Sequence, residues 1–436
     1  MTIRPQPTEF SSAERSFTPQ DRCASILEAL LTSRGNPSDE IEQVLAENPE
    51  LAFGHCLRIA IIVRRDDGDA RSRCLESVTA IESICRDADH PARRHAFAAR
   101  AWLDGDQVLA AERYGAIVAD CPRDILALVV AHAFDFRLGL RQMLRDRIAR
   151  VLPHWHAAIP FYASVLAMYA FGLEENGQYG RAERMARRAL ELDPRHAGAV
   201  HAISHVMEMQ GRCREGLAFL TATEAAWVDT GFAVHLAWHR ALFHLEAGDA
   251  QSALAVYDAR IAQSCSMSEL ADASALLWRL QFCDTRLGAR WSQLADRWDG
   301  QVLAGARSFY ITHAMMAFAA AGRTVAVQRI FDLLREADSG APSALYSEEA
   351  LVLPLCTALF AFSRRDYATC IERLVRVRDI AHRCGGSLAQ CDLIQLTVVE
   401  AALRARKVNL ARVLVAERMA QKPSSRLNRR FEQRLA

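Results

Sequence analysis

The chain has few turn-forming residues and no excess charge of either sign. Glycine and proline together supply 34 of its 436 residues, too few for the many tight turns of a β-sandwich or barrel. Lysine plus arginine, 53 residues, nearly cancels aspartate plus glutamate, 52 residues. Overall charge therefore gives no reason to expect binding to nucleic acid or to an anionic membrane, and we expect partners of neither kind.

Long hydrophobic runs and paired cysteines are also missing. The longest apolar stretches, such as residues 351–362, fall well short of the roughly 20 residues that a membrane-spanning helix needs. Residues 1–20 are polar and broken by three prolines, so we expect a disordered tail there and no secretory signal. Twelve cysteines are scattered without a CxxC pair, which favours buried, reduced thiols and a cytoplasmic location.

Regularly spaced glycines are the most informative feature that the sequence does have. Hydrophobic residues make up 51% of the chain and charged residues 24%, a balance typical of a folded protein. Glycines that close helical stretches follow one another at intervals of 34, 38, 34, 37, 40 and 34 residues. They are Gly105, Gly139, Gly177, Gly211, Gly248, Gly288 and Gly322. A recurrence near 34 residues is the period of tetratricopeptide-type (TPR) helical hairpins.

The segments after these glycines support a TPR-like repeat. In GQYGRAERMARRALELDP, residues 177–194, a small residue stands five positions after the glycine and a proline stands seventeen positions after it. Glycine permits the turn, alanine lets two helices approach closely, and proline ends the second helix. We predict an all-α fold, a right-handed α-α superhelix of about ten to twelve TPR-like helical hairpins. It forms one domain over residues 21–436, with the clearest repeats at 91–337.

Histidines gather on the predicted inner face of this superhelix. The first helix of a TPR-type unit lines the inner surface, and the positions ten, six and three residues before the turn glycine share one side of it. In the unit ending at Gly211 these positions are His201, His205 and Glu208, an HxxxHxxE stripe. In the neighbouring units the inward positions hold His95, Trp102, Phe171, Glu174, His235, Trp238 and His239.

Three interpretations of these histidines remain open. A single inward histidine can simply hydrogen-bond a carboxylate or a backbone carbonyl. Two neighbouring HxxxH pairs with inward glutamates can serve as general acid and base. They can also chelate a divalent metal, since residues four apart stand about 6 Å from each other on a helix. A metal is possible but not favoured, because no fixed motif such as HExxH is present.

Helix packing predicts how close these side chains come. The first helices of adjacent units stand about 8 to 10 Å apart. We therefore expect the His201 and His205 pair to face the His235 and His239 pair across one helix boundary. Glu174 is expected to reach the same cluster from the other side.

Several segments, in matching order over about residues 48–436, point to one known family. They are AHAFDFRLG (131–139), HAISHVMEMQGR (201–212), HLAWHRALFHLEAGD (235–249), THAMMAF (312–318), GGSLAQCD (385–392) and LARVLVAERMAQKP (410–423). The chain resembles the tetratricopeptide repeat protein 38 family, which implies an α-α superhelical fold and an intracellular protein. The resemblance also points to five matching polar residues: His132, Asp135, His313, Gln390 and Asp392. Leu388 and Cys391 depart from the family pattern, so the ligand of this chain is expected to differ.

The predicted function is the binding of a small polar molecule or a peptide end in a concave pocket lined by His, Glu and Trp. Its chemical centre is His201, His205, Glu208, His235 and His239. One alternative is an enzyme that uses these same five residues for acid-base or metal-assisted chemistry, and another is a protein-interaction scaffold. The predicted ligand contacts around the centre are His95, Trp102, His132, Asp135, Phe171, Glu174, Trp238, His313, Gln390 and Asp392.

Overall fold

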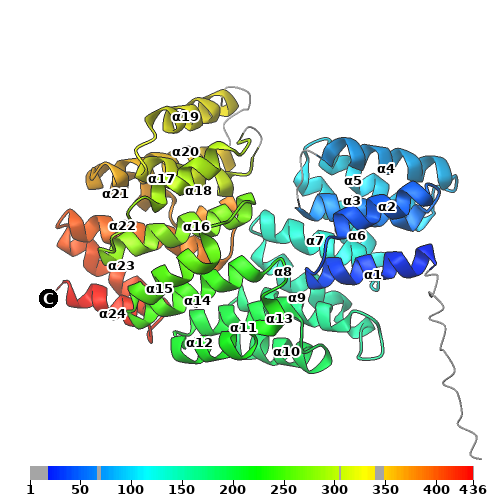
Figure 1. Cartoon of the computed structure of the whole chain (residues 1–436), viewed down its shortest axis with the longest axis horizontal. Coiled ribbons are helices and arrows are strands. Elements are labelled where there is room, and N and C mark those ends of the chain that lie inside the picture. The colour runs from blue at the N-terminus through cyan, green and yellow to red at the C-terminus, as the bar shows by residue number, and fades with distance from the viewer. Residues whose placement is uncertain (1–17, 66–69, 304–305, 339–347, 436) are drawn as a thin grey trace, which may run out of the picture.

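Helices that pack in consecutive pairs make up nearly all of the computed structural model (Figure 1). The structure describes residues 18–65, 70–303, 306–338 and 348–435. No strand occurs within these ranges, so the prediction of an all-α fold is confirmed. Most of the predicted tail, residues 1–17, lies outside the described residues, and the first helix already begins at Pro19.

Each pair consists of an inner first helix and an outer second helix. The first helices are α1 (Pro19–Thr32), α3 (Ala52–Arg65), α5 (Pro91–Leu103), α7 (Ile125–Arg137), α9 (Tyr162–Glu174), α11 (Ala197–Met209), α14 (Ala233–Ala247), α16 (Met267–Leu280), α18 (Ser308–Ala320), α20 (Glu348–Ser363) and α22 (Leu388–Arg404). The second helices are α2 (Pro37–Glu47), α4 (Arg71–Ile84), α6 (Gln107–Asp120), α8 (Arg141–Val151), α10 (Tyr179–Leu192), α12 (Cys213–Ala222), α15 (Ala250–Val256), α17 (Arg290–Asp299), α19 (Thr324–Asp338), α21 (Tyr367–Val377) and α23 (Val408–Gln421). These eleven pairs fall within the predicted range.

Two helices stand outside the pairs. The turn glycines have the left-handed backbone conformation that the repeat predicts. The unpaired helices are α13 (Glu224–Trp227) and α24 (Arg426–Gln433). All seven glycines that define the repeat have φ between 55° and 93°. In this left-handed region a side chain is strained, so glycine is the residue that lets the chain reverse between helices.

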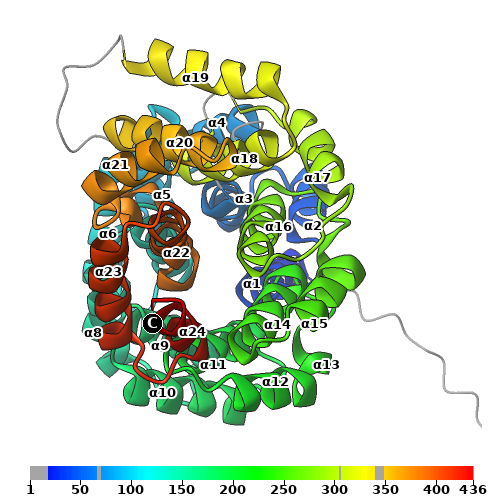
Figure 2. The ribbon, with the colours of Figure 1, turned by 90° about the vertical axis from the view of Figure 1, so that its left-hand side faces the viewer.

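The two layers of the superhelix bury different amounts of their surface. First helices contact the first helices of the neighbouring units, as along the series α9, α11, α14, α16, α18 and α20. They are therefore apolar on nearly all sides, and α16 buries eleven consecutive residues from Leu270 to Leu280. Second helices such as α17 bury a single stripe. Figure 2 shows α16 and α22 nearest the central axis and α12, α19 and α23 on the outside.

The superhelix returns on itself after about half of the chain. Helix α22 contacts α11 and α16, and α24 contacts α14. Glu246, at the end of α14, accepts hydrogen bonds from the backbone N–H groups of Arg426 and Leu427. At the other end of the chain, Arg34 donates to the carbonyl oxygen of Ala226 over 2.8 Å. Both ends of the described chain thus pack against its middle units, and no described helix is long and apolar enough to span a bilayer.

Candidate functional site

Four histidines from two neighbouring inner helices converge on one point. His201 and His205 project from α11, and His235 and His239 project from α14. One ring nitrogen of each lies within 4.8 Å of a ring nitrogen of the other three. Nε2 of His201 is 3.0 Å from Nε2 of His235, and the rings of His205 and His239 have centroids 4.5 Å apart. The structure thus brings together the two pairs that the repeat spacing places on facing helices.

A carboxyl group stands behind three of these imidazole rings. Asp272 Oδ2 accepts a hydrogen bond from His235 Nδ1 over 2.7 Å, and Glu208 Oε2 accepts one from His239 Nδ1 over 2.9 Å. Since a carboxylate only accepts hydrogen bonds, Nδ1 of both rings carries a proton. Their other nitrogen, Nε2, can act as an electron-pair donor when it carries no proton, and Nε2 of His235 faces Nε2 of His201.

Glu174 occupies the third outer position, behind His205. Its Oε2 atom is 3.4 Å from His205 Nδ1, and it comes from the last turn of α9. With Asp272 on α16, the cluster therefore draws its side chains from four successive inner helices. This is possible because the inner helices pack directly on one another, with no second helix between them.

Several polar atoms of the cluster are buried without a hydrogen bond. The side chains of His205, His239 and Glu174 are completely buried. Both ring nitrogens of His205, Nε2 of His239 and both carboxyl oxygens of Glu174 have no hydrogen-bond partner among the described residues. A buried polar group without a partner costs about 1 to 3 kcal/mol of stability. Packing alone is therefore a poor explanation for placing these side chains here.

Burial and mutual repulsion separate the proton affinities of the cluster. Burial lowers the pKa of His205 to about 4, and burial together with the neighbouring histidines holds the pKa values of His201 and His239 well below their ordinary range. Burial acts in the same direction on His235, but the Asp272 carboxylate outweighs it and raises the pKa of this ring. Burial and the nearby Glu208 raise the pKa of Glu174 to about 8. At neutral pH, His201, His205 and His239 are therefore uncharged.

Aromatic rings close two sides of the cluster. The Phe171 ring lies 5.4 Å from the rings of both His201 and His205. The indole of Trp238 is stacked on His235 at 5.3 Å with an interplanar angle of 16°. These rings keep water from the deeper histidines, while the His235 side chain stays 20% exposed. The cluster is therefore accessible from the side of His201 and His235.

Three of the predicted ligand contacts lie in the N-terminal half, in contacts of their own. His95 pairs with Asp124 over 2.9 Å. Trp102 is buried in the hydrophobic core of the N-terminal units. Asp135 is fully buried and forms two hydrogen bonds with Arg147, of 2.7 and 2.9 Å. The structure does not bring these three residues to the histidine cluster.

The remaining predicted contacts are divided between the cluster and its surroundings. Gln390 donates to Asp272 Oδ1 over 3.2 Å, so it supports the carboxylate behind His235. The ring of His132 lies 6.2 Å from Phe171, at the edge of the cluster. His313 bonds through Nδ1 to the carbonyl oxygen of Phe309 over 2.7 Å. Asp392 pairs with Arg418 on the C-terminal helices.

Asp272 is the member of the site that sequence reasoning missed. It stands sixteen residues before Gly288, outside the three positions that the turn rule examines. A signal was nevertheless present, because Asp272 follows His235 by 37 residues and His235 follows His201 by 34. The close contacts of this site thus join residues about one repeat apart. An acidic residue one period after an inward histidine was the pattern to look for.

Comparison with known proteins gives a likeness of shape only. No family model matches the chain. The chain is similar to the crystal structure of the APC/C hetero-tetramer Cut9–Hcn1, with 11% identity over 96% of this chain and 72% of that chain and a TM-score of 0.48. It is also similar to a structure of Naa15/Naa10 bound to HypK-THB, with 11% identity over 94% of this chain and 64% of that chain and a TM-score of 0.26. Such distant likenesses say nothing about the chemistry of the histidine cluster. The consecutive hairpins themselves make the chain a TPR-like helical repeat protein.

Proposed function

We propose that the chain is a metalloprotein that holds one divalent transition-metal ion between His201, His205, His235 and His239. The observation that carries this proposal is the convergence of four imidazole nitrogens within 4.8 Å. Zinc–nitrogen bonds of about 2.0 to 2.1 Å place the ligand atoms of a tetrahedral ion about 3.4 Å apart. Metal binding therefore requires side-chain rotations that shorten the widest of these separations by up to about 1.4 Å.

The donor set selects the kind of ion. Neutral imidazole suits zinc, copper, iron and nickel, whereas magnesium and calcium prefer oxygen ligands. Asp272 and Glu208 hold the protons of His235 and His239 on Nδ1, which orients the rings and strengthens the opposite nitrogens as donors. Metal binding also gives a partner to Nε2 of His239 and to one of the two ring nitrogens of His205, which have none among the described residues.

The proposal also includes the small polar ligand and the protein family that the sequence predicts. The accessible edge formed by His201 and His235 is where a small polar molecule reaches the ion. The stretches 201–212 and 235–249 that carry the four histidines are among those resembling the tetratricopeptide repeat protein 38 family. Membership of that family and a cytoplasmic location are part of the proposal.

Elemental analysis of the purified full-length protein tests the proposal. We expect about one ion of zinc, iron, copper or nickel per chain after dialysis. The double variant H205Q/H239Q keeps side-chain volume and hydrogen-bonding capacity but removes two donors, so its metal content should fall to background. The matched control is His55→Gln, because His55 is a buried histidine that bonds Ser77 and Pro49 in the N-terminal units. It should retain the wild-type content.

Two results would contradict the proposal. One is a wild-type protein that neither contains nor takes up any of these metals at micromolar concentration. The other is a double variant that retains the full metal content while remaining folded by circular dichroism.

Acid-base chemistry without a metal is the second candidate function. The raised pKa of Glu174 keeps this carboxyl protonated at neutral pH, and it lies 3.4 Å from the neutral His205. A proton donor and a proton acceptor thus stand side by side. An activity that persists in the presence of a strong chelator and is lost in Glu174→Gln would favour this candidate over the metal centre.

A protein-interaction scaffold remains the general alternative for a TPR-like fold. Scaffolds that bind peptide ends present Lys, Arg and Asn to the terminal carboxylate. The four converging side chains of the cluster itself are imidazoles, which favours the metal-binding proposal at this point of the inner surface.

A further inference from the structure

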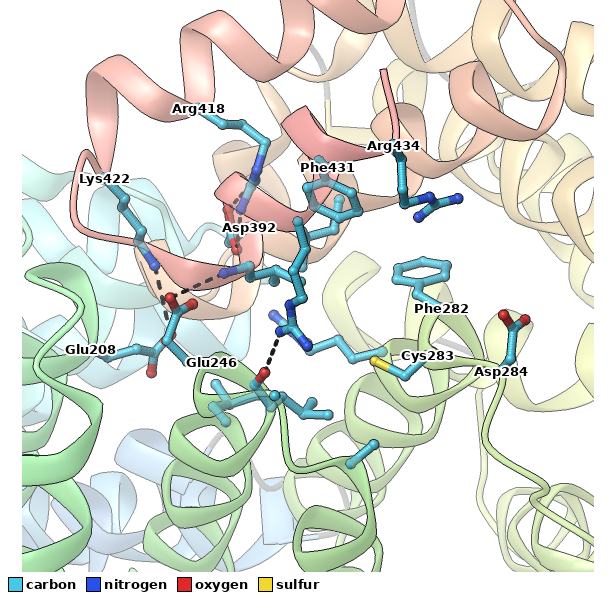
Figure 3. Close-up of a pocket in the computed structure, with 18 residues that line it drawn as sticks. Glu208, Glu246, Phe282, Cys283, Asp284, Asp392, Arg418, Lys422, Phe431 and Arg434 are labelled. Carbon is cyan, nitrogen blue, oxygen red and sulfur yellow. Dashed lines mark hydrogen bonds and ion pairs between the residues drawn. The ribbon is translucent and has the colours of Figure 1, made fainter. Parts of the chain in front are cut away.

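A cavity lies next to the histidine cluster, where the C-terminal helices close on the middle of the chain. It has a volume of about 390 Å³ and is bounded by the ends of α14 and α16 and by α22, α23 and α24. Figure 3 shows Lys422 and Glu208 on one side of it and Phe282 and Asp284 on the opposite side. Glu208 belongs to both sites, because its other oxygen accepts the hydrogen bond from His239.

Not all of the charged side chains that line this cavity pair with one another. Five cationic side chains and four carboxylates form its wall. Asp392 accepts two hydrogen bonds from Arg418, of 2.6 and 3.2 Å. Glu246 accepts hydrogen bonds from backbone N–H groups at the start of α24. Two of the four carboxylates are therefore already engaged with partners in the protein.

Two guanidinium groups in the wall have no carboxylate of their own. Arg279 is 6% exposed and donates to the backbone carbonyl oxygens of Ala275 and Ala389. Arg430 donates to the carbonyl oxygen of Leu245 over 2.7 Å, and its buried Nε has no hydrogen-bond partner in the described part of the chain. Neither forms an ion pair with a described carboxylate. Guanidinium groups that hydrogen-bond only backbone carbonyl oxygens in a partly desolvated cavity can receive an anion.

Lys422 is the most unusual residue of the wall. The chain uses arginine for nearly all its positive charge and has only two lysines, Lys407 and Lys422. The Lys422 side chain is 11% exposed, and its ammonium group lies 3.9 Å from Glu208, beyond hydrogen-bonding distance. An ammonium group can donate three hydrogen bonds, and among the described residues this one donates none. Its capacity to donate hydrogen bonds is therefore unused among the described residues and can serve a ligand.

The other part of the wall is apolar. Leu242, Leu396, Phe282 and Phe431 line the cavity together with the charged groups. A volume of this size and a few polar groups set in an apolar wall are typical of sites for small organic molecules. A bare inorganic anion fits this cavity less well than a small organic molecule does, because the apolar part of the wall contributes nothing to binding such an anion.

We propose that this cavity binds a small organic acid, a molecule with one carboxylate or phosphate group and an apolar body. Lys422, Arg430 and Arg279 receive the anionic group, and Phe282 and Phe431 cover the body. This site goes beyond the metal centre and does not depend on it, although Glu208 connects the two. The ligand is expected to draw Lys422 away from Glu208.

Titration calorimetry with three probes tests the site in the full-length protein. The probes are 4-phenylbutanoate, phenyl phosphate and the uncharged 4-phenylbutanamide. We expect saturable binding of at least one anion and at least about tenfold weaker binding of the amide, since hydrogen bonds to charged groups are the strong ones. Lys422→Met should weaken anion binding about tenfold, while the matched variant Lys407→Met should leave it unchanged.

Chemical labelling of the wild-type protein gives a readout that needs no variant. Because the chain has two lysines, an amine-acetylating reagent followed by peptide mapping reports on each separately. The bound anion should slow the acetylation of Lys422 and leave that of Lys407 unaffected. Absence of saturable binding by both anions, equal binding of the amide, or unaltered Lys422 labelling would each overturn the proposal. The same titrations in H205Q/H239Q separate the two sites, because loss of the metal should leave anion binding intact.

Discussion

At the scale of single residues, the carboxylates behind the histidines decide whether the rings act as ligands. Asp272 holds the His235 ring by its Nδ1 proton. Replacing Asp272 by Asn removes the charge that makes His235 a strong donor, so metal affinity should fall about 10-fold to 100-fold. Competition with a chromophoric chelator measures this. Asp258→Asn is the control, because Asp258 is exposed and pairs with Arg290 of the outer helix α17.

If the metal affinity is unchanged both in Asp272→Asn and in the control, Asp272 does not influence His235 as a metal ligand. The same outcome would also weaken the metal proposal, since outer carboxylates of true metal sites rarely have no effect.

A second residue-scale prediction concerns acid stability. Burial acts to raise the pKa of Asp392, but Arg418 and Lys422 outweigh it and hold this pKa well below the ordinary value. A carboxyl whose pKa is lowered by folding stabilises the protein above its unfolded pKa of about 3.9, and this contribution is lost as the pH falls through the folded pKa. The wild-type protein should therefore lose stability as the pH decreases below about 4.

Asp392→Asn makes this prediction measurable. At pH 7 it should lower the free energy of unfolding by about 3 to 5 kcal/mol, because Arg418 is left buried without its counter-charge. Below pH 4 the dependence of the melting temperature on pH should become shallower than in the wild type. A variant with wild-type stability at pH 7, or with the same steep acid dependence, would contradict the assignment.

Residue-scale prediction from sequence succeeded where one helix determines the geometry. His201 and His205 share a face because they are four residues apart, and the turn at Gly211 fixes which face points inward. Asp272 and Lys422 could not be found this way. The position of Asp272 depends on the register between two units, and that of Lys422 depends on how far the superhelix turns before it meets itself. Neither the register between units nor the extent of the superhelical turn follows from the spacing of residues within one helix.

At the scale of helices, one glycine sets the distance between α8 and α9. A Cβ atom at Gly172 would lie 2.4 Å from the backbone oxygen of Leu144, closer than any van der Waals contact allows. Gly172→Ala must push these helices apart and should cost about 1 to 3 kcal/mol. Since Gly172 is two residues from Glu174, metal affinity should decrease as well.

The control for this change is Gly180→Ala on the outer helix α10. The nearest atom to a Cβ at Gly180 is the end of the Arg184 side chain at 3.7 Å. Alanine is the better helix former, so this variant should be neutral or stabilised by up to about 1 kcal/mol. Thermal unfolding of both variants measures the difference. If the Gly172→Ala protein is as stable as the Gly180→Ala protein, the close contact between α8 and α9 at Gly172 does not limit the stability of the fold.

The hairpins themselves could be predicted because their turns carry a local signal. The seven glycines that define the repeat have positive φ at turns where a first helix reverses into a second, and they recur with the units, whereas Arg365 and Arg406 have positive φ at the turns after α20 and α22. No such glycine precedes helix α24, because this helix is not part of a hairpin. It begins where Glu246 of α14 accepts the N–H groups of Arg426 and Leu427, a contact across about 180 residues that no local pattern reveals.

At the scale of the whole molecule, the C-terminal helices lock a repeat array that would otherwise be open. Deleting residues 424–436 removes α24 and its contacts with α14. In an array stabilised by neighbouring units the other helices should remain folded, so the far-UV circular dichroism per residue should change little. The melting temperature should fall, and Lys422 should become more reactive toward acetylation because the cavity loses one wall.

Two outcomes would contradict this view of the closure. The first is an unchanged melting temperature, which would mean that α24 adds no stability. The second is a collapse of helicity throughout the chain, which would mean that the units do not fold independently of the closing contact.

The long separation between the parts of the site has a consequence for how the protein is made. His205 and Lys422 are 217 residues apart, and ribosomes add about 5 to 20 residues per second. About 10 to 40 s therefore pass between the synthesis of the histidine helices and that of the helices that close over the cavity next to them. During this interval the histidines of α11 and α14 are open to the surrounding solution on that side. Translation thus gives the nascent chain a period in which an ion can enter from that side as well as from the edge of His201 and His235.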